Sequence, residues 1–591
     1  GTGLYTRSTV TLTNVSLPTS GSILLGDDDI HTNANLTIQS NLALAGNLTI
    51  DIAGSSVAGF GITTLSGDIT GSGGLTDAYA GASVPGTYNA GNGFQGTLLL
   101  SGTDSYSGST TVTGGTLVFA GNETGIGAPL NVQNGVLQFA FGSSINSASQ
   151  VTLGSGTASG LLVLGDGTNG ISTTISSLTT SGTSSASDEV VNGGSATTST
   201  LTIDNSSADT YAGVLGGTGT NQNLLALTKS GAGTLTLSGA NTDTGTTNVT
   251  AGTLAFGTVA ANGSAQPLGA GFSAIQLGNA TLQYTGSTNA TALNRSITVT
   301  SGDTGTISNT GGGTLTLGAT VGSATLTKAG ANLVLTGGNF VINDVITSNR
   351  ITDTSFNSDM YFSTGGTVTL NAQNTYFGNT FIDTNTTVQN GISDALPTDT
   401  VLTLGENTGN TNGELDLNSY NQTIAGLTTS GTGTANIITN NASGTGKSTL
   451  TIDNDTTTSN ANYTFSGSIQ DGSTAHIALV KSGDHTLTLT GNANTYSGGT
   501  TVQGGTLAVN NTSGSGTGSG SVTVDSGGVL SGSGIIAPDI DSGVTIADGG
   551  QLHPGADPVG TAANGYLTRT SASRATTPVL TLATPASVGE L

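Results

Sequence analysis

The sequence predicts an all-β fold, a parallel β-solenoid with almost no α-helix. Three observations lead to this prediction. Short segments alternate between Thr and an aliphatic residue, a short tripeptide recurs at a regular short spacing, and long blocks recur much further along the chain. No stretch shows a sustained apolar rhythm of helical period with helix caps, so little helix is expected.

The alternating segments read as short strands. In each, Thr alternates with Leu or Val, and a period of two is typical of a strand with one buried face. Gly, Asn, Asp and Ser bracket these segments, as turns require. Four examples are Thr9-Val10-Thr11-Leu12, Thr234-Leu235-Thr236-Leu237, Thr367-Val368-Thr369-Leu370 and Thr486-Leu487-Thr488-Leu489.

The spacing of a tripeptide predicts how these strands stack. Gly-Thr-Leu recurs at the same short spacing in two places, and a related Thr-Leu pair recurs at nearly that spacing. About 20–25 residues make one coil of a parallel β-helix, so like residues are expected to stack on like, with Leu inside and Thr outside. The residues are Gly96-Thr97-Leu98 with Gly115-Thr116-Leu117, Gly233-Thr234-Leu235 with Gly252-Thr253-Leu254, and Thr486-Leu487 with Thr506-Leu507.

A slower repeat indicates duplicated blocks of coils. Ser199–Asn205 returns as Ser448–Asn454, and Leu227–Gly231 returns in similar form as Leu479–Gly483, at almost the same offset along the chain. A solenoid accepts added coils because each coil contacts only its neighbours. We therefore expect one elongated body with an N-terminal solenoid segment at 1–95, a repeat-bearing body at 96–510 and a C-terminal segment at 511–591.

Composition narrows the function classes. Nine Lys and Arg residues face 34 Asp and Glu residues, which gives a net charge of −25. The basic residues are scattered, so neither nucleic acid nor an anionic lipid surface is an expected partner. There is no Cys, which rules out a disulfide scaffold. No apolar run approaches the roughly 20 residues of a membrane helix, and the sequence opens without a signal segment, so we interpret it as a mature, processed product.

One segment resembles a known family. Lys481-Ser482-Gly483, Thr486–Gly491, Asn494–Val502 (with Tyr496) and Gly504–Leu507 look like the autotransporter-associated β-strand repeat of passenger-type β-helix proteins. Three further copies are similar in sequence, one departing at a single position, where Asp243 stands in place of the usual Tyr. They cover Lys229–Phe256, Gly96–Phe119 with Tyr106, and, in degenerate form, Gly365–Ile382 with Tyr376.

The resemblance implies a right-handed β-helix that is secreted by a Gram-negative-type bacterium and exposed at the cell surface. Gly549–Gly555, followed by Pro558 and Gly560, resembles a segment near the end of many such passengers. The recurring residues Tyr106, Tyr376 and Tyr496 have two interpretations. They make adhesive contacts, or they stack on the next coil with the hydroxyl at the rim, which is the favoured interpretation.

Candidate chemistry is sparse, and no catalytic or cofactor-binding residue is predicted. Asp27-Asp28-Asp29 is the densest acidic run and the one weak Ca²⁺ candidate, although a solvated turn is the simpler interpretation. The four histidines (His31, His476, His485 and His553) lack metal-ligand spacing. No Gly-Xaa-Ser-Xaa-Gly elbow is placed between a strand and a helix. Enzymes that cleave polysaccharides need clustered carboxylates with Arg or Lys, and usually aromatic residues that bind the sugar. The sequence has no Trp, and its Arg residues are scattered, so it shows no such set of residues.

The sequence therefore predicts an extracellular structural or adhesive protein rather than an enzyme. The hypothesis includes end-to-end or lateral association of copies into a fibre or biofilm matrix, and contact with surface or matrix polysaccharide. Two alternatives stay open: an acidic surface-array protein of the S-layer kind, and a carbohydrate-active β-helix enzyme.

Overall fold

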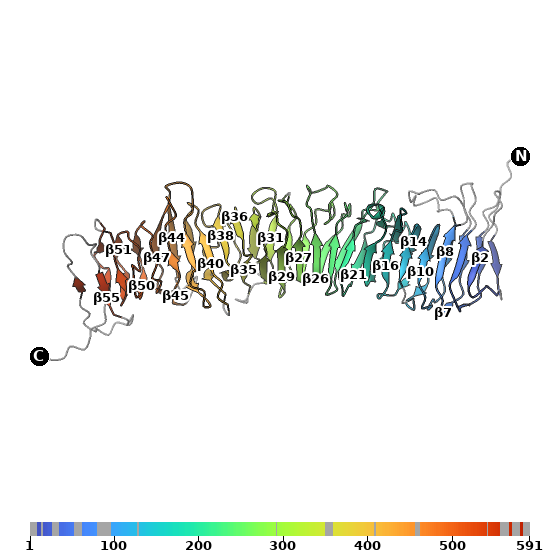
Figure 1. Ribbon diagram of the computed structural model, residues 1–591, viewed down its shortest axis with the longest axis horizontal. Coiled ribbons are helices and arrows are strands. Elements are labelled where there is room, and N and C mark those ends of the chain that lie inside the picture. Colours follow the sequence, from blue (N-terminus) through green and yellow to red (C-terminus); the bar gives the residue numbers. More distant parts are fainter. Residues whose placement is uncertain are drawn as a thin grey trace. The chain divides into compact units, whose positions relative to one another are not determined.

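The computed structural model describes most of the chain, and parallel stacks of strands joined by turns and corners are its main architecture (Figure 1). The chain divides into two compact units, Gly1–Thr285 and Gly286–Leu591, which are described separately. The described residues are 9–13, 16–25, 35–52, 62–79, 96–126, 129–290, 292–348, 358–406, 409–454, 461–539, 542–555, 567–569 and 580–582.

Two long parallel sheets form much of the first unit. One contains, in stacking order, β1 (Thr9–Leu12), β3 (Asn35–Ile38), β6 (Ile62–Leu65), β9 (Thr97–Leu100), β11 (Thr116–Phe119), β14 (Gly135–Phe139), β17 (Gly160–Leu164), β20 (Glu189–Asn192) and β23 (Val214–Leu215). The other contains β2 (Gly21–Leu25), β5 (Leu48–Ile52), β8 (Leu75–Tyr79), β10 (Thr110–Val112), β13 (Leu130–Val132), β16 (Gln150–Leu153) and β19 (Ser177–Thr180).

Shorter stacks complete the first unit. Two small pairs are β4 (Leu42–Leu44) with β7 (Ile69–Gly71), and β12 (Asn122–Glu123) with β15 (Ser144–Ile145). The later coils contain β18 (Ser172–Ile175), β21 (Ser199–Ile203), β24 (Leu225–Lys229), β26 (Thr247–Phe256) and β27 (Ile275–Tyr284), with β22 (Asp209–Tyr211) and β25 (Thr234–Leu237) beside them. Among the described residues the only helical segment is a 3₁₀ turn at Ser185–Ser187.

The second unit is built from the same kind of parallel stack. One stack contains β29 (Thr304–Asn309), β32 (Asn332–Thr336), β35 (Met360–Ser363), β37 (Thr380–Ile382), β39 (Val401–Leu404) and β42 (Gly426–Thr429). Beside it lie β28 (Ile297–Val299), β31 (Thr325–Lys328) and β34 (Val345–Ser348). A further sheet contains β30 (Leu315–Leu317), β33 (Phe340–Ile342), β36 (Thr367–Leu370), β38 (Thr386–Asn390), β40 (Gly413–Asp416), β43 (Ile437–Thr439) and β46 (Ser468–Ile469).

Two more parallel sheets carry the later coils of the second unit. The first contains β41 (Gln422–Ile424), β44 (Lys447–Asp453), β47 (His476–Ser482), β49 (Thr500–Val502), β51 (Val522–Val524) and β54 (Val544–Ile546). The second contains β45 (Tyr463–Phe465), β48 (Thr486–Leu489), β50 (Gly505–Val509), β52 (Gly528–Gly532) and β55 (Gln551–Pro554).

The predicted parallel β-solenoid is therefore confirmed in each unit. Inward-facing Leu, Ile and Val alternate along many strands with half-exposed Thr, as in the alternating burial of β25 and β48. Each coil buries only a thin apolar column, so stability comes from the coil above and the coil below. The boundaries predicted at 95/96 and 510/511 stay predictions.

Coil length varies more than the tripeptide spacing predicts. Thr97 pairs with Thr116 of the following coil, whereas Ile62 pairs with Thr97, so the coil that starts at Ile62 is almost twice as long. Only the strands must stack in register, because the corners between them lie outside the ladders. A corner can therefore lengthen without disturbing the apolar column.

The last strands depart from parallel pairing. The sequence predicts a strand around Pro578–Leu582, and β57 (Leu580–Leu582) forms there. It pairs antiparallel with both β53 (Ile535–Ile536) and β56 (Leu567–Arg569). The chain thus folds back on an earlier coil at this point instead of continuing the parallel stack.

Candidate functional site

The recurring tripeptides lie on top of one another. Thr97 and Leu98 pair with Thr116 and Leu117, Thr234 and Leu235 pair with Thr253 and Leu254, and Thr486 and Leu487 pair with Thr506 and Leu507. All six leucines are fully buried. Gly96, Gly115 and Gly252 have positive φ angles, so they form corners where a side chain would be strained.

The recurring tyrosines lie inside the solenoid. Tyr106, Tyr376 and Tyr496 are at most 1% exposed. The hydroxyl of each forms a hydrogen bond with the Thr four residues later, at 2.6–2.7 Å between oxygens, and this Thr begins the next strand (Thr110, Thr380 and Thr500). The structure therefore places the hydroxyl in the interior rather than at the rim. Direct adhesive contact by these rings has no support in this geometry.

Three lysines are buried as well, which the sequence analysis missed. Lys229, Lys328 and Lys481 are 0% exposed. Burial lowers the pKa of Lys229, and it lowers the pKa of Lys481 to about 8, with nearby aspartates acting in the opposite direction. The sequence did indicate this burial: Lys229 lies two residues after the inward-facing Leu227, so both residues lie on the same face of the strand.

The lysine ammonium groups bind backbone carbonyls at the corners. Lys229 Nζ donates to the carbonyls of Gly231 and Ala251, and Lys481 Nζ donates to those of Gly483 and Gly504. Lys328 Nζ donates to the carbonyls of Ser358 and Phe377 and lies 5.0 Å from the centre of the Tyr376 ring. These contacts join successive coils through interior charge-assisted hydrogen bonds.

An aromatic pair lies on the outer face of the second unit. Tyr361 of β35 and Phe381 of β37 are stacked, with ring centroids 4.8 Å apart and an interplanar angle of 11°. Both residues are half-buried. Asp359 accepts a hydrogen bond from the Tyr361 hydroxyl at 3.4 Å and from the Asn379 backbone at 2.9 Å. Burial and the neighbouring carboxylates raise the pKa of Tyr361.

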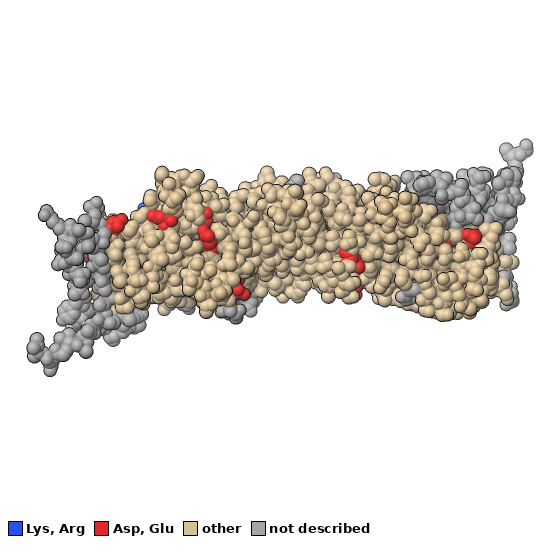
Figure 2. Space-filling model, in the orientation of Figure 1, with Lys and Arg blue, Asp and Glu red and all other residues tan. Residues whose placement is uncertain are grey.

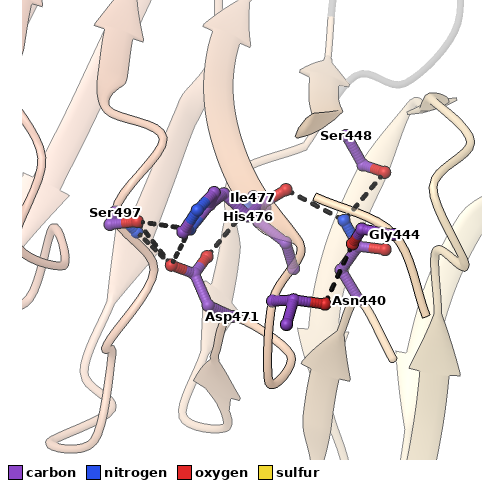
Figure 3. Close-up of polar contacts among 8 residues, drawn as sticks. Asn440, Gly444, Ser448, Asp471, His476, Ile477 and Ser497 are labelled. Carbon is purple, nitrogen blue, oxygen red and sulfur yellow. Dashed lines mark hydrogen bonds and ion pairs between the residues drawn. The ribbon is translucent and has the colours of Figure 1, made fainter. Parts of the chain in front are cut away.

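Asp471, His476 and Ser497 form an exposed polar cluster that resembles a nucleophilic triad only in composition (Figure 3). His476 Nδ1 faces both Asp471 Oδ2 at 2.9 Å and Ser497 Oγ at 2.8 Å. Ser497 Oγ also donates to Asp471 Oδ2 at 2.5 Å. A working triad needs the carboxylate and the hydroxyl on opposite imidazole nitrogens. In this cluster one nitrogen faces both, and the hydroxyl proton is directed to the carboxylate.

The cluster instead joins neighbouring coils. Asp471 also accepts hydrogen bonds from the backbone N–H groups of Ile477 at 2.7 Å and Ser497 at 3.0 Å. Asn440 extends this network by donating to the His476 carbonyl at 2.9 Å and to the Ser448 hydroxyl at 3.1 Å. Of the other histidines, His485 is a half-buried bend residue whose ring contacts the Asn454 carbonyl.

Neither a metal-ligand cluster nor a membrane helix is found in the described ranges. Among those residues, no three His, Cys, Asp or Glu side chains gather closely enough to hold a metal ion. Within the same ranges, no helix is long and apolar enough to cross a membrane. The Ca²⁺ candidate Asp27-Asp28-Asp29 lies outside the described residues.

Comparison with known proteins identifies the repeat. A family model described as the passenger-associated-transport-repeat matches residues 95–119, 227–256 and 479–509. Three segments of the chain are similar to this repeat. These spans contain the stacked tripeptides, Tyr106, Tyr496 and two of the buried lysines. The degenerate segment Gly365–Ile382 has the same interior Tyr–Thr hydrogen bond.

A curated relative is named as an autotransporter adhesin. The chain is 29% identical over 366 residues to the adhesin BmaC autotransporter of Brucella suis biovar 1 (strain 1330). The match covers 57% of this chain but 9% of the adhesin, so the chain spans a small part of that relative's length. No solved structure matches the chain.

The first passenger-associated-transport-repeat departs from the others at a buried acid pair. Asn241, Asn374 and Asn494 each donate a side-chain hydrogen bond to a carbonyl one coil later. Asp104 replaces this Asn and hydrogen-bonds Glu123 instead, and both residues are 1% exposed. Burial and then the charge of Asp104 raise the pKa of Glu123 to about 9. The raised pKa favours the protonated form of Glu123 at neutral pH.

Proposed function

We propose that this chain is an extracellular adhesive β-solenoid protein, secreted or displayed at the surface of a Gram-negative bacterium. The passenger-associated-transport-repeats and the similarity to part of a protein named as an adhesin support this proposal. On the face drawn in Figure 2, the described acidic side chains form small separated groups among neutral residues. A neutral polar surface of this kind suits contact with uncharged polymers better than contact with polyanions.

The stacked pair Tyr361–Phe381 is the observation that carries the adhesive proposal. These residues occupy paired outward positions next to a repeat corner. The same outward positions hold Thr76 and Thr111, Thr228 and Asn248, or Val480 and Thr501 in the matched repeats. An aromatic surface beside Asp359 and the Asn379 backbone offers a stacking face and hydrogen-bonding groups, which together suit a sugar ring. We therefore propose surface or matrix polysaccharide as the ligand.

Replacing both rings should weaken retention on polysaccharide. We expect Tyr361→Ala/Phe381→Ala to reduce binding of the purified chain to immobilised bacterial polysaccharide by about tenfold or more, because each stacking contact contributes about 0.5–1.5 kcal/mol. Surface plasmon resonance would measure this. The matched control is Thr228→Ala/Asn248→Ala, which changes the same two positions in another copy and should retain binding. Equal losses in the two variants would contradict the proposal.

Fibre formation is a second proposal, favoured by the first described coil. Within the described ranges, β1 pairs only with β3 and β2 pairs only with β5. Leu12 on β1 and Leu24 on β2 are 37% and 60% exposed. An edge strand with exposed apolar side chains can pair with another chain. We propose that this edge joins copies of the chain end to end.

Negative-stain images of concentrated protein would test the fibre proposal. We expect filaments for the natural sequence and separate particles for Leu24→Lys, because a lysine on an edge strand blocks pairing. Phe141→Lys is the control, since Phe141 is 58% exposed but lies away from this edge. Flat sheets would favour the surface-array alternative, and separate particles of the natural protein would contradict end-to-end pairing.

A further inference from the structure

One interior position recurs at the three matched repeats with different occupants, and in the first copy it precedes the matched residues 95–119. In each, an inward residue lies between an Ile of the coil before and a Val of the coil after. Two copies hold a lysine there and the first copy holds an aspartate. The columns are Ile203–Lys229–Val249, Ile452–Lys481–Val502 and Ile50–Asp77–Val112.

The two lysine copies show what this corner binds. Lys229 Nζ lies 3.3 Å from the carbonyl oxygen of Ala251, and Lys481 Nζ lies 3.0 Å from that of Gly483 and 3.3 Å from that of Gly504. Ala251 and Gly504 each lie two residues after the Val of the column. The backbone at this corner therefore presents carbonyl oxygens to a buried positive charge.

The first copy repeats one backbone hydrogen bond of this corner but lacks the ammonium group. The Asp77 carbonyl accepts a hydrogen bond from the Thr113 backbone at 2.9 Å, as the Lys481 carbonyl accepts one from Gln503 at 2.8 Å. Gly114 lies two residues after Val112, at the position of Ala251 and Gly504. The strand after the corner is therefore paired with the Asp77 backbone as it is with the Lys481 backbone, although β8 runs on from Asp77 to Tyr79 whereas β24 ends at Lys229.

Asp77 places an unsatisfied carboxylate at this corner. Its side chain is 0% exposed, and neither carboxylate oxygen has a hydrogen-bond partner among the described residues. Asp51 on the neighbouring strand β5 adds a second negative charge nearby. Burying a carboxylate without a partner is very costly, and burial raises the pKa of Asp77 well above its usual value. Either a bound proton or a cation must therefore neutralise it.

We propose that Asp77 and the carbonyl oxygens of this corner bind a divalent cation, with Ca²⁺ preferred. A divalent ion paired with one carboxylate carries the same net charge as the lysine ammonium that the corner binds elsewhere. Ca²⁺ takes carboxylate and carbonyl oxygens in flexible geometry, whereas Mg²⁺ demands a near-ideal octahedron and sheds water reluctantly. The ion would replace, in the first repeat, the charge that Lys229 and Lys481 carry in the others.

Thermal unfolding of the full chain with Ca²⁺ or with a chelator tests the proposal. We expect Ca²⁺ to raise the unfolding midpoint of the natural protein by a few degrees and Mg²⁺ to raise it less. Asp77→Asn should lose this response. Asp77→Lys should be insensitive to Ca²⁺ and unfold near the midpoint of the Ca²⁺-loaded natural protein, because it supplies its own cation.

Equilibrium dialysis with radioactive calcium provides a second readout if Asp77→Lys fails to fold. The natural protein should bind one more ion than Asp77→Asn. The control is Asp27→Asn/Asp28→Asn/Asp29→Asn, which should keep both the ion bound at Asp77 and the thermal response. Three outcomes would overturn the proposal: no Ca²⁺ response in the natural protein, a response that survives in Asp77→Asn, or stabilisation by acid alone without any effect of Ca²⁺.

Discussion

Gly505→Ala should destabilise the second unit by about 3 kcal/mol or more. Gly505 begins β50 with φ near 54°, in the left-handed region. A Cβ there would lie 2.6 Å from the carbonyl oxygens of both Gly483 and His485, which belong to the preceding coil. The backbone would have to shift, and the shift would pull the Thr486–Thr506 ladder out of register. Urea unfolding followed by circular dichroism would measure the loss.

Gly527→Ala is the matched control for this prediction. Gly527 also has a positive φ, near 90°, but a Cβ built there meets no atom within 4 Å. Its substitution should cost only the backbone strain of about 1–2 kcal/mol. A similar loss in the two variants would show that strain, and not the approach of successive coils, sets the requirement for glycine.

The protein should unfold at a higher temperature at pH 5 than at pH 7.5. Asp188 and Asp344 are buried, and burial raises the pKa of each to about 6, against a partial opposing effect of one backbone hydrogen bond. The folded state therefore binds these protons more tightly than the unfolded chain does. Their stabilising effect is complete below the unfolded pKa near 4 and is lost as the pH rises through 6, at about 1–2 kcal/mol per group.

Asp188→Asn/Asp344→Asn should reduce this pH dependence, while Glu123, whose pKa is also raised, should continue to contribute with the same sign. The Asn oxygen can still accept the backbone hydrogen bonds that Gly160 and Ala324 donate to Asp188 and Asp344. Lys481 does not contribute to the change in stability between pH 5 and 7.5, because its pKa of about 8 lies above this pH range. Calorimetry between pH 4.5 and 7.5 would provide the measurement. A midpoint that rises with pH in the natural protein would refute the argument.

Much of the solenoid follows from sequence because the strand period and the coil spacing are both visible. The Gly-Thr-Leu tripeptides define the ladder register, and each lies one coil from its partner. The same spacing in the sequence would also have predicted two residue pairs that the sequence analysis missed. Asp104 and Glu123 are as far apart in sequence as two stacked tripeptides, so this pair had to lie on adjacent coils. Tyr361 and Phe381 are as far apart as the stacked Thr-Leu pairs of β48 and β50, with the same consequence.

Other features depend on the corners between strands. The spacing of residues in the sequence does not define the path of the chain through a corner. The hydrogen bond between Tyr496 and Thr500 forms because the chain turns between them and brings the ring inside. The length of the coil between Ile62 and Thr97 and the antiparallel return of β57 are likewise decided by loops. The recurrence of the tyrosines was visible in the sequence, but the burial of their hydroxyl groups could not be predicted from it.

The buried basic residues also bear on how long such a protein persists outside a cell. Trypsin-like enzymes cut after Lys and Arg, and they require the surrounding backbone to detach and enter a cleft. Of nine such residues in the whole chain, Lys229, Arg295, Lys328 and Lys481 are at most 2% exposed. The three lysines lie in or at the end of ladder strands, where cleavage would require several coils to open together. The ammonium groups that join the coils are thus also withdrawn from proteases, and we expect cleavage after these lysines to be slower than cleavage after the exposed Lys447.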